Sequence, residues 1–159
     1  MPPISMTSAD LQTFIAERGI EASILPMAAH TSTVDDAARE LKVAAEQIIK
    51  SLVFMVNDQP LLVITNGTAR VDRKKLATLL GVGRKRVRFA DADQARDITG
   101  FVVGSMPPFG HRQTLRTLVA PAVTRLDLIY GGGGDIDAML RLTPAELLRA
   151  TTAEVVEVS

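Results

Sequence analysis

The sequence predicts one mixed α+β domain in which helices surround a strongly curved, mixed β-sheet. The chain has 159 residues, the size of one ordinary domain, and we assign residues 1–159 to a single domain. Its 47% hydrophobic and 23% charged residues are typical of a folded globular protein. Helical and strand-like segments intermix without a strict βαβ order, which favours a mixed sheet over a parallel one.

Cap residues and turn signals delimit the elements of the N-terminal half. Thr7 or Ser8 can cap a first helix that extends to about Arg18 and ends at Gly19. Thr33 can cap a second helix with acidic residues in its first turn. The other predicted elements of this half are a strand at 23–27, a short helix at 44–49, and strands at 51–56 and 60–66 joined by a hairpin turn at 57–59.

The C-terminal half continues with short helices and strands. A helix stops at Gly81, and another begins at Thr143, where Pro144 occupies the first turn. The predicted elements are helices over 71–81, 91–100 and from 143, and strands over 86–89, 101–104, 117–123, 126–131 and 139–142.

Charge and cysteine content restrict the functional classes. Eighteen Lys and Arg balance eighteen Asp and Glu, so the net charge identifies no partner. The absence of cysteine excludes disulfides, thiolate zinc sites and a cysteine nucleophile. The N-terminal sequence lacks the features of a signal peptide, and no apolar run approaches the roughly 20 residues of a membrane span. We therefore expect a cytoplasmic protein with no membrane partner.

An apolar, glycine-rich segment at residues 100–111, GFVVGSMPPFGH, is the first candidate site. Its glycines let the backbone approach a ligand closely, and Pro107-Pro108 excludes a helix and stiffens the segment. The spacing is neither the dinucleotide-binding fingerprint nor a P-loop. The segment is therefore either a tight connection or the wall of a pocket.

Lys50 is the only charged residue in IIKSLVFMV, residues 48–56. Burying an unpaired ammonium is costly, so we expect Lys50 to reach a pocket mouth, water or an anion. It is either a snorkelling lysine at the start of a strand or a lysine that stabilises an oxyanion. The glycine run at 131–134 is likewise either a flexible turn or another wall of the same pocket.

Four sequence blocks together resemble the YbaK/EbsC family of aminoacyl-tRNA deacylases, which is related to the editing domain inserted in bacterial prolyl-tRNA synthetases. The blocks are KSLVF at 50–54, VDRKKL at 71–76, TGFVVGSMPPFGH at 99–111, and IYGGGG at 129–134 followed by LTPAEL at 142–147. The resemblance extends from about Thr7 to the last predicted helix. Four blocks in the same order and spacing are more specific than any one of them.

The resemblance implies a barrel-like sheet and a trans-editing hydrolase. Such an enzyme deacylates mischarged tRNA, here tRNA for proline carrying a wrong small amino acid, by ester hydrolysis without a metal, another cofactor or a covalent enzyme intermediate. The implied partners are the 3′ aminoacyl end of that tRNA and, in addition, prolyl-tRNA synthetase; no DNA partner is expected. The glycine-rich loop would hold the aminoacyl carbonyl with backbone amides, and Lys50 would contact the tRNA end.

The candidate site residues follow from these blocks and, for His30, from the N-terminal segment that borders the pocket in the family. The candidate catalytic residues are Lys50, Gly104, Ser105 and His111, and the candidate substrate-binding residues are His30, Ser51, Phe101, Met106, Pro107, Gly132 and Gly133. His111 is either a general base that positions water or a surface histidine that caps the loop. Ser51 stands where the alanine-specific editors have Asn. His30 is either a residue at the start of a helix or part of the pocket border.

A basic segment at 70–88 gives an independent indication of an RNA partner. It contains eight Lys and Arg residues against one acidic residue, Asp72. We expect Arg84, Lys85 and Arg86 to bind RNA, the alternative being a solvated helix face and turn. No interleaved aromatic residues support base stacking in this segment, since only Phe89 is near.

Two other functions fit the same residues. The chain could be a non-catalytic module that binds aminoacyl-tRNA ends or a synthetase, with the loop serving recognition alone. It could also be a hydrolase with a Ser-His-Asp triad that uses Ser105, His111 and an aspartate. The second alternative is disfavoured because Ser105 lacks the strand-turn-helix context of G-x-S-x-G.

Overall fold

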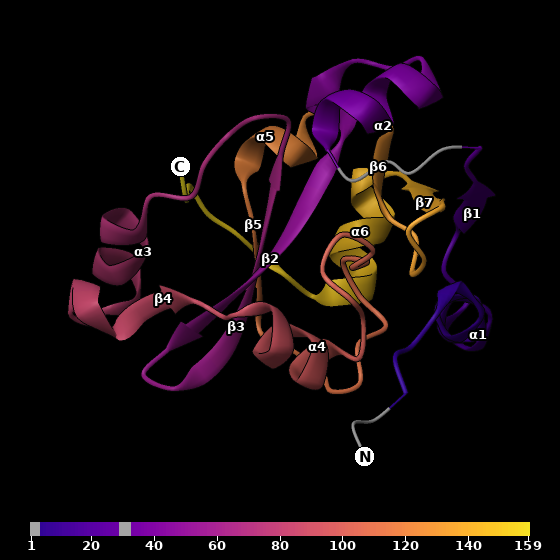
Figure 1. Ribbon diagram of the computed structural model, residues 1–159. Coiled ribbons are helices and arrows are strands. Elements are labelled where there is room, and N and C mark those ends of the chain that lie inside the picture. The colour runs from indigo at the N-terminus through magenta and orange to yellow at the C-terminus, as the bar shows by residue number, and fades with distance from the viewer. Residues whose placement is uncertain (1–3, 29–32) are drawn as a thin grey trace.

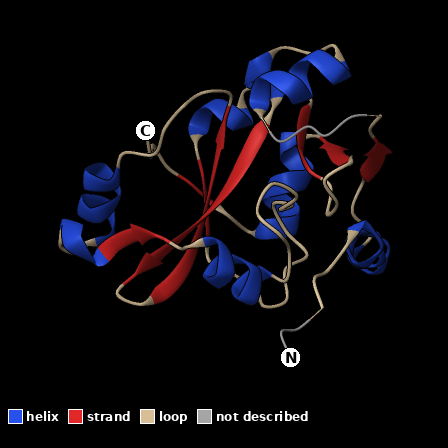
Figure 2. Ribbon diagram, in the orientation of Figure 1, coloured by secondary structure: helices blue, strands red, loops and turns tan. Residues whose placement is uncertain are grey.

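Two β-sheets with helices around them form the fold, as the computed structural model, which describes residues 4–28 and 33–159, shows (Figure 1; Figure 2). The larger sheet has the strand order β4-β2-β3-β5-β8, and the smaller one the order β1-β7-β6. The strands are β1 (Ala22–Pro26), β2 (Ile49–Val56), β3 (Gln59–Asn66), β4 (Val87–Phe89), β5 (Thr117–Val119), β6 (Ile129–Gly132), β7 (Ala138–Leu142) and β8 (Glu154–Val155). The predicted mixed α+β class is confirmed.

The helices begin where the sequence places cap residues. Thr7, Thr33 and Thr143 each accept a hydrogen bond from a backbone N–H of the first helical turn. The helices are α1 (Ser8–Arg18), α2 (Val34–Leu41), α3 (Arg73–Leu80), α4 (Ala92–Thr99), α5 (Pro121–Thr124) and α6 (Pro144–Thr151), with 3₁₀ turns η1 (Ala45–Gln47) and η2 (Arg84–Arg86). None of the described helices is long and apolar enough to cross a membrane.

The hairpin β2–β3 runs across the middle of the molecule (Figure 1). Its strands are joined by Asn57 and Asp58, which have φ of 48° and 63°, as a two-residue type I′ turn requires. On its other side β3 pairs with β5 in parallel, and β5 pairs with β8 in parallel. The larger sheet therefore mixes parallel and antiparallel pairs, as predicted.

The sheets do not close into the barrel that the family resemblance implied. An isolated parallel bridge between Ile48 and Tyr130 links β2 to β6, and β4 pairs with β2 only from Phe54 to Val56. Between the bridge at Ile48 and the start of the β4 pairing at Phe54, no described strand pairs with the side of β2 that faces away from β3. The edge therefore has a gap over residues 50–52, and the candidate site lies at this gap.

The segment 101–104 was predicted to be a strand, and this prediction is wrong. Ser105 N–H donates to the Val102 carbonyl at 3.1 Å, which closes a turn in which Gly104 has φ of +99°. A positive φ cannot continue a strand, so the β-branched Val102 and Val103 lie in a loop. The predicted strand at 117–123 likewise ends at Val119, because Pro121 begins α5.

Candidate functional site

A cavity of about 430 Å³ lies between the gap in β2, the turn at 102–105 and the ends of β6 and β7. Its volume is within the usual range for small-molecule sites. It is lined by Thr33, Val34, Ala37, Ile48, Ile49, Lys50, Ser51, Leu52, Val103, Gly104, Met106, Gly132 and Met139. We call it the loop cavity. Five predicted site residues meet there: Lys50, Ser51, Gly104, Met106 and Gly132.

Gly104 occupies the third position of the turn. Its φ of +99° is one that L side chains rarely adopt, and a Cβ built there would meet no atom within 4 Å. Glycine is therefore needed for the backbone conformation and not for lack of space in the protein. The open space beside it is part of the loop cavity.

Ser105 lies beneath the turn and is only 3% exposed. Its Oγ donates to the Val102 carbonyl at 2.8 Å, and its own carbonyl accepts from Gly134 N–H at 2.9 Å. Ser105 is absent from the residues that line the loop cavity. Its contacts close the turn and tie it to the glycine run.

The glycine run lets this turn lie directly against β6. A Cβ on Gly132 would lie 2.2 Å from the Met106 carbonyl oxygen, and one on Gly133 would lie 2.7 Å from the Ala138 carbonyl oxygen. Both distances are too short for any side chain. Gly132 reaches the loop cavity, whereas Gly133 is buried behind it.

His111 supports the loop from behind. Its Nε2 lies 2.7 Å from the Pro107 carbonyl oxygen; because a carbonyl only accepts, Nε2 carries the proton and donates. The ring packs edge-on against buried Phe101, with centroids 6.2 Å apart. Burial lowers the pKa of His111 below 6.5, so the ring is neutral near pH 7.

Several predicted residues therefore lie outside the loop cavity. Phe101 and Pro107 are buried in the core behind the turn, and His111 borders a separate cavity of about 60 Å³. His111 does not contact Ser105 in the way that a triad would require, because its Nε2 is bonded to Pro107. His30 lies outside the described residues.

Lys50 lies where the loop cavity meets a second one. Its Nζ donates to the Ala69 carbonyl at 3.2 Å, and in the described parts of the chain it forms no ion pair. An ammonium has three donors. Two therefore have no described partner and are available to a ligand.

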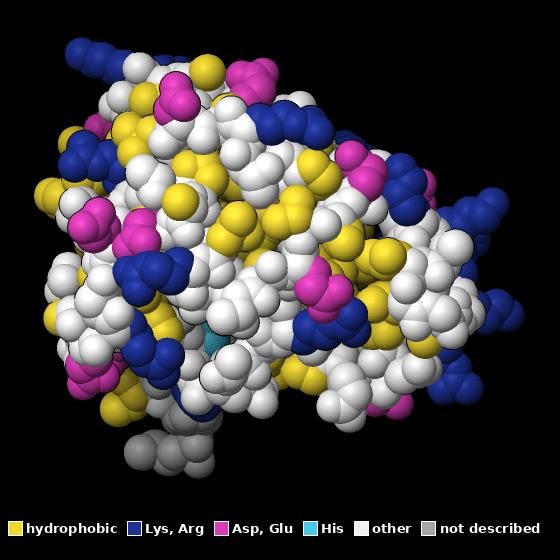
Figure 3. Space-filling model, turned by 180° about the vertical axis from the view of Figure 1, so that it is seen from behind, with side chains coloured by type: hydrophobic (Ala, Val, Ile, Leu, Met, Phe, Trp, Pro, Cys, Tyr) yellow, Lys and Arg dark blue, Asp and Glu magenta, His cyan; other side chains and the backbone are white. Residues whose placement is uncertain are grey.

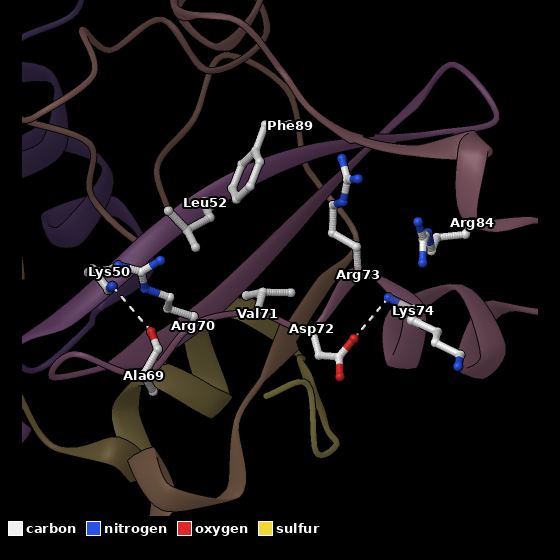
Figure 4. A pocket seen from close by; sticks show the side chains of 10 residues that line it. All are labelled: Lys50, Leu52, Ala69, Arg70, Val71, Asp72, Arg73, Lys74, Arg84 and Phe89. Carbon is white, nitrogen blue, oxygen red and sulfur yellow. Dashed lines mark hydrogen bonds between the residues drawn. The ribbon is translucent and has the colours of Figure 1, made fainter.

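The second cavity has a volume of about 640 Å³ and lies between β2, β4 and the start of α3 (Figure 4). We call it the basic cavity. It is lined by Lys50, Leu52, Ala69, Arg70, Val71, Asp72, Arg73, Lys74, Arg84 and Phe89. Lys50 and Leu52 border both cavities. Of the predicted RNA-binding residues, Arg84 lines it, whereas Lys85 and Arg86 are exposed beside it.

The gap in β2 also contributes backbone groups. Ala90 N–H donates to the Val53 carbonyl at 3.0 Å on the side of β2 where β4 lies. Backbone groups of residues two apart on a strand point to the same side. The N–H and C=O of Ser51 therefore face the gap, where the described residues supply no strand to pair with them.

Sequence reasoning missed several lining residues. Val34 and Ala37 lie one turn apart on α2 and face the loop cavity together with Met139 of β7. The apolar spacing on this helix was the available signal. Phe89 was noted only as an isolated aromatic residue, because its exposure depends on the tertiary structure.

Comparisons with known proteins identify the family of the chain. The family profile of the aminoacyl-tRNA editing domain matches residues 28–150, more than half of the chain. The chain belongs to this family. The sequence resemblance to aminoacyl-tRNA editing proteins is therefore confirmed.

Relatives of the chain include a protein of similar length and parts of synthetases. It is 25% identical to the uncharacterized protein YwhH of Bacillus subtilis over 89% of both chains. It is 37% identical to the proline–tRNA ligase of Lactobacillus gasseri over 66% of its own length and 18% of that ligase. A solved structure of a proposed trans-editing enzyme for prolyl-tRNA synthetase superposes with a TM-score of 0.89, 30% identity and 96% coverage of both chains.

Metal binding has no support in the described parts of the chain. No group of three or more His, Asp or Glu side chains in residues 4–28 and 33–159 is placed to hold a metal ion. Among the described residues, the loop cavity is provided with an ammonium, backbone amides and hydroxyl groups.

Proposed function

We propose that the protein hydrolyses the ester bond of mischarged aminoacyl-tRNA, with tRNA for proline carrying a wrong small amino acid as its substrate. The observation that carries this proposal is the loop cavity, where Lys50, the Gly104 turn and the open edge of β2 meet. The similarity to proline–tRNA ligases and to a proposed trans-editing enzyme supports the choice of tRNA. This activity belongs with translation, and we place the protein in the cytoplasm.

The proposed reaction is attack of water on the ester carbonyl. The water oxygen bonds to the carbonyl carbon, the bond from this carbon to the ribose oxygen breaks, and a proton passes to that oxygen. None of the residues that line the described cavity is His, Asp or Glu. In this proposal the proton acceptor is solvent or a group of the substrate, and the protein contributes orientation and charge stabilisation.

Positive charge and backbone N–H groups stabilise the developing oxyanion in this mechanism. Lys50 supplies an ammonium with two free donors, and the turn at Gly104 presents its backbone to the cavity. Removing one such donor typically slows acyl transfer about 100- to 1000-fold. Ser105 and His111 act indirectly in this proposal, because their hydrogen bonds hold the turn in shape.

Pocket size and polarity set the preference for a small side chain. Val34, Ala37, Met106 and Met139 give the loop cavity apolar walls, and Thr33 and Ser51 add hydroxyl groups. Apolar walls separate side chains that differ by one methylene only about 10- to 200-fold. We therefore expect a group of small amino acids to be removed at different rates.

A deacylation screen tests the proposal. Purified protein is incubated with tRNA for proline charged with Ala, Cys, Ser, Thr or Pro, and the surviving ester is measured over time. We expect at least one of the first four to be hydrolysed faster than the prolyl ester. Hydrolysis of none of them, or of the prolyl ester as fast as the others, would contradict editing.

Recognition without catalysis is the second candidate function. The observation that favours it is that none of the described residues lining the loop cavity is His, Asp or Glu. In that case the chain would bind the aminoacyl-tRNA end, or prolyl-tRNA synthetase, without breaking the ester. Protection of the ester against spontaneous hydrolysis in the same screen would identify this function.

A further inference from the structure

We propose that the basic cavity binds the unpaired nucleotides that precede the terminal adenosine of the tRNA, with Phe89 as the stacking platform. This inference rests on the proposed function, since it assigns a second part of the same substrate. It assigns residues that the family blocks do not contain, because Phe89, Arg70 and Arg84 lie outside all four of them.

Phe89 presents one face of its ring for stacking. Its side chain pairs with Phe54 across β4 and β2, and the two ring centroids are 4.3 Å apart. Phe54 is fully buried, whereas Phe89 is 52% exposed. One face of the ring is therefore fixed against the core, and the other is free at the cavity. A fixed aromatic face accepts any nucleobase, because every base can stack on it.

Apolar and charged groups are arranged around this ring as a single-stranded nucleic acid requires. Leu52 and Val71 are half-buried and provide an apolar surface for a base. Arg70, Arg73 and Arg84 are exposed at the same cavity, and guanidinium groups bind phosphate by paired hydrogen bonds or stack on bases. Lys50 lies at one end of the cavity and Arg84 at the other (Figure 4).

The charge of the cavity is complementary to phosphate. Its five cationic lining residues form no ion pair within the described ranges. Asp72 is the one acidic lining residue, and its carboxylate already accepts from the N–H groups of Lys74 and Lys75 at 3.0 and 3.1 Å. Lys and Arg side chains also project from the edge formed by α3 and η2 when the molecule is seen from behind (Figure 3).

The two cavities are neighbours, because Lys50 and Leu52 line both. In this proposal an RNA strand that leaves the basic cavity passes Lys50 into the loop cavity. The terminal adenosine would then lie at Lys50, the aminoacyl group in the loop cavity, and the preceding bases at Phe89. Unpaired RNA suits this path, since its bases are free to leave the stack and contact protein.

Fluorescence anisotropy with a 5′-labelled single-stranded RNA hexanucleotide ending in CCA tests the site. We expect Phe89→Leu to weaken binding about tenfold and Phe89→Tyr to change it less than twofold, since Tyr keeps the ring. Leu79→Ala is the matched control: Leu79 is 48% exposed on α3 but does not line the cavity, and its loss should leave binding unchanged. Affinity of Phe89→Leu within twofold of the wild type would overturn the proposal, as would tighter binding of an acidic peptide of equal charge.

A double-mutant cycle identifies the stacked nucleotide. Each of the two nucleotides before the terminal adenosine is replaced in turn by an abasic one, and each RNA is measured with the wild type and with Phe89→Leu. Loss of the base and loss of the ring should be non-additive at one position, because both remove the same contact. Additive losses at both positions would overturn the assignment.

These measurements use uncharged RNA, so they do not depend on ester hydrolysis. If the deacylation screen fails and the RNA results hold, the proposed hydrolysis is wrong and the RNA site remains. If the screen succeeds and Phe89→Leu binds as the wild type does, this inference alone is wrong. Thermal unfolding of each variant checks that the fold is retained.

Discussion

At the scale of single residues, Lys50 is half-buried and has an incompletely bonded ammonium where the two cavities meet. We predict that Lys50→Met slows single-turnover deacylation at least 100-fold, because it removes the charge next to the developing oxyanion and retains the apolar stem. The unfolding midpoint should change little. Lys42→Met, at an exposed lysine outside both cavities, is the control. Normal turnover of a folded Lys50→Met protein would exclude the assigned role.

Gly104 gives a second prediction at this scale. Gly104→Ala adds strain of roughly 1 kcal/mol at φ +99°, because the space for a Cβ is open but the backbone conformation is unfavourable. We expect the single-turnover rate to fall at least tenfold, about 1.4 kcal/mol of transition-state stabilisation, as the turn shifts its amides. Gly132→Ala is the contrasting variant: its Cβ would meet the Met106 carbonyl oxygen at 2.2 Å, so it should mainly lower the unfolding midpoint. A near-normal rate for Gly104→Ala would mean that the loop is only a connection.

At the scale of elements, His111 links the end of the loop to its proline pair and makes stability depend on pH. Burial lowers its pKa in the folded state below 6.5, so the unfolded chain binds more protons between that lowered pKa and 6.5. The contribution of the neutral ring to the free energy of unfolding is therefore fully present above pH 6.5. It is lost as the pH falls from 6.5 toward the lowered pKa. Urea midpoints from pH 7.5 to 5 should fall more steeply for the wild type than for His111→Gln. An equal dependence of the urea midpoint on pH in both proteins would contradict the assigned effect of His111.

The turn η2 carries three consecutive exposed basic residues between α3 and β4. We predict that replacing Arg84, Lys85 and Arg86 together by alanine weakens tRNA binding and flattens its salt dependence. Each lost phosphate contact should reduce the slope of log K against log salt by about 0.7 for single-stranded RNA and about 0.9 for a duplex. Titrations at several salt concentrations measure this slope. An unchanged slope would mean that these three residues do not contact the RNA phosphates.

Elements defined by local signals were predictable, and those defined by distant contacts were not. The first helix was correctly predicted, because Thr7 and Gly19 cap it through neighbouring backbone groups. The hairpin was correctly predicted for the same reason, since its turn depends only on the local conformation of Asn57 and Asp58. The apolar segment 101–104 has the composition of a strand, but its conformation is set by Gly104 and the hydrogen bond from Gly134 to Ser105. The two-residue strand β8 forms only by pairing with β5, more than 30 residues away, and left no local signal.

At the scale of the whole molecule, the sequence blocks indicated which segments meet, but not how they are layered. Lys50, Gly104 and Gly132 were predicted to share a site and do line one cavity. Ser105, Phe101 and His111 belong to the same blocks but lie behind the turn. Ser105 is held there by its hydrogen bond to Val102, and His111 by its hydrogen bond to Pro107. The basic cavity was not predicted, because it forms only where β2, β4 and the start of α3 come together.

The position of the loop cavity between the two sheets leads to a prediction for the whole molecule. Its lining comes from β2 in the larger sheet and from Gly132 and Met139 in the smaller one, while the isolated bridge at Ile48 and Tyr130 joins these sheets directly. An RNA whose 3′ end carries alanine through a stable amide should therefore slow hydrogen exchange in β2 and in β6–β7 together. The same RNA without alanine should protect mainly β4 and the start of α3. At 100 times its dissociation constant the aminoacylated analogue should also stabilise the fold by about 2.7 kcal/mol. Protection confined to one sheet would show that the aminoacyl group does not enter the loop cavity.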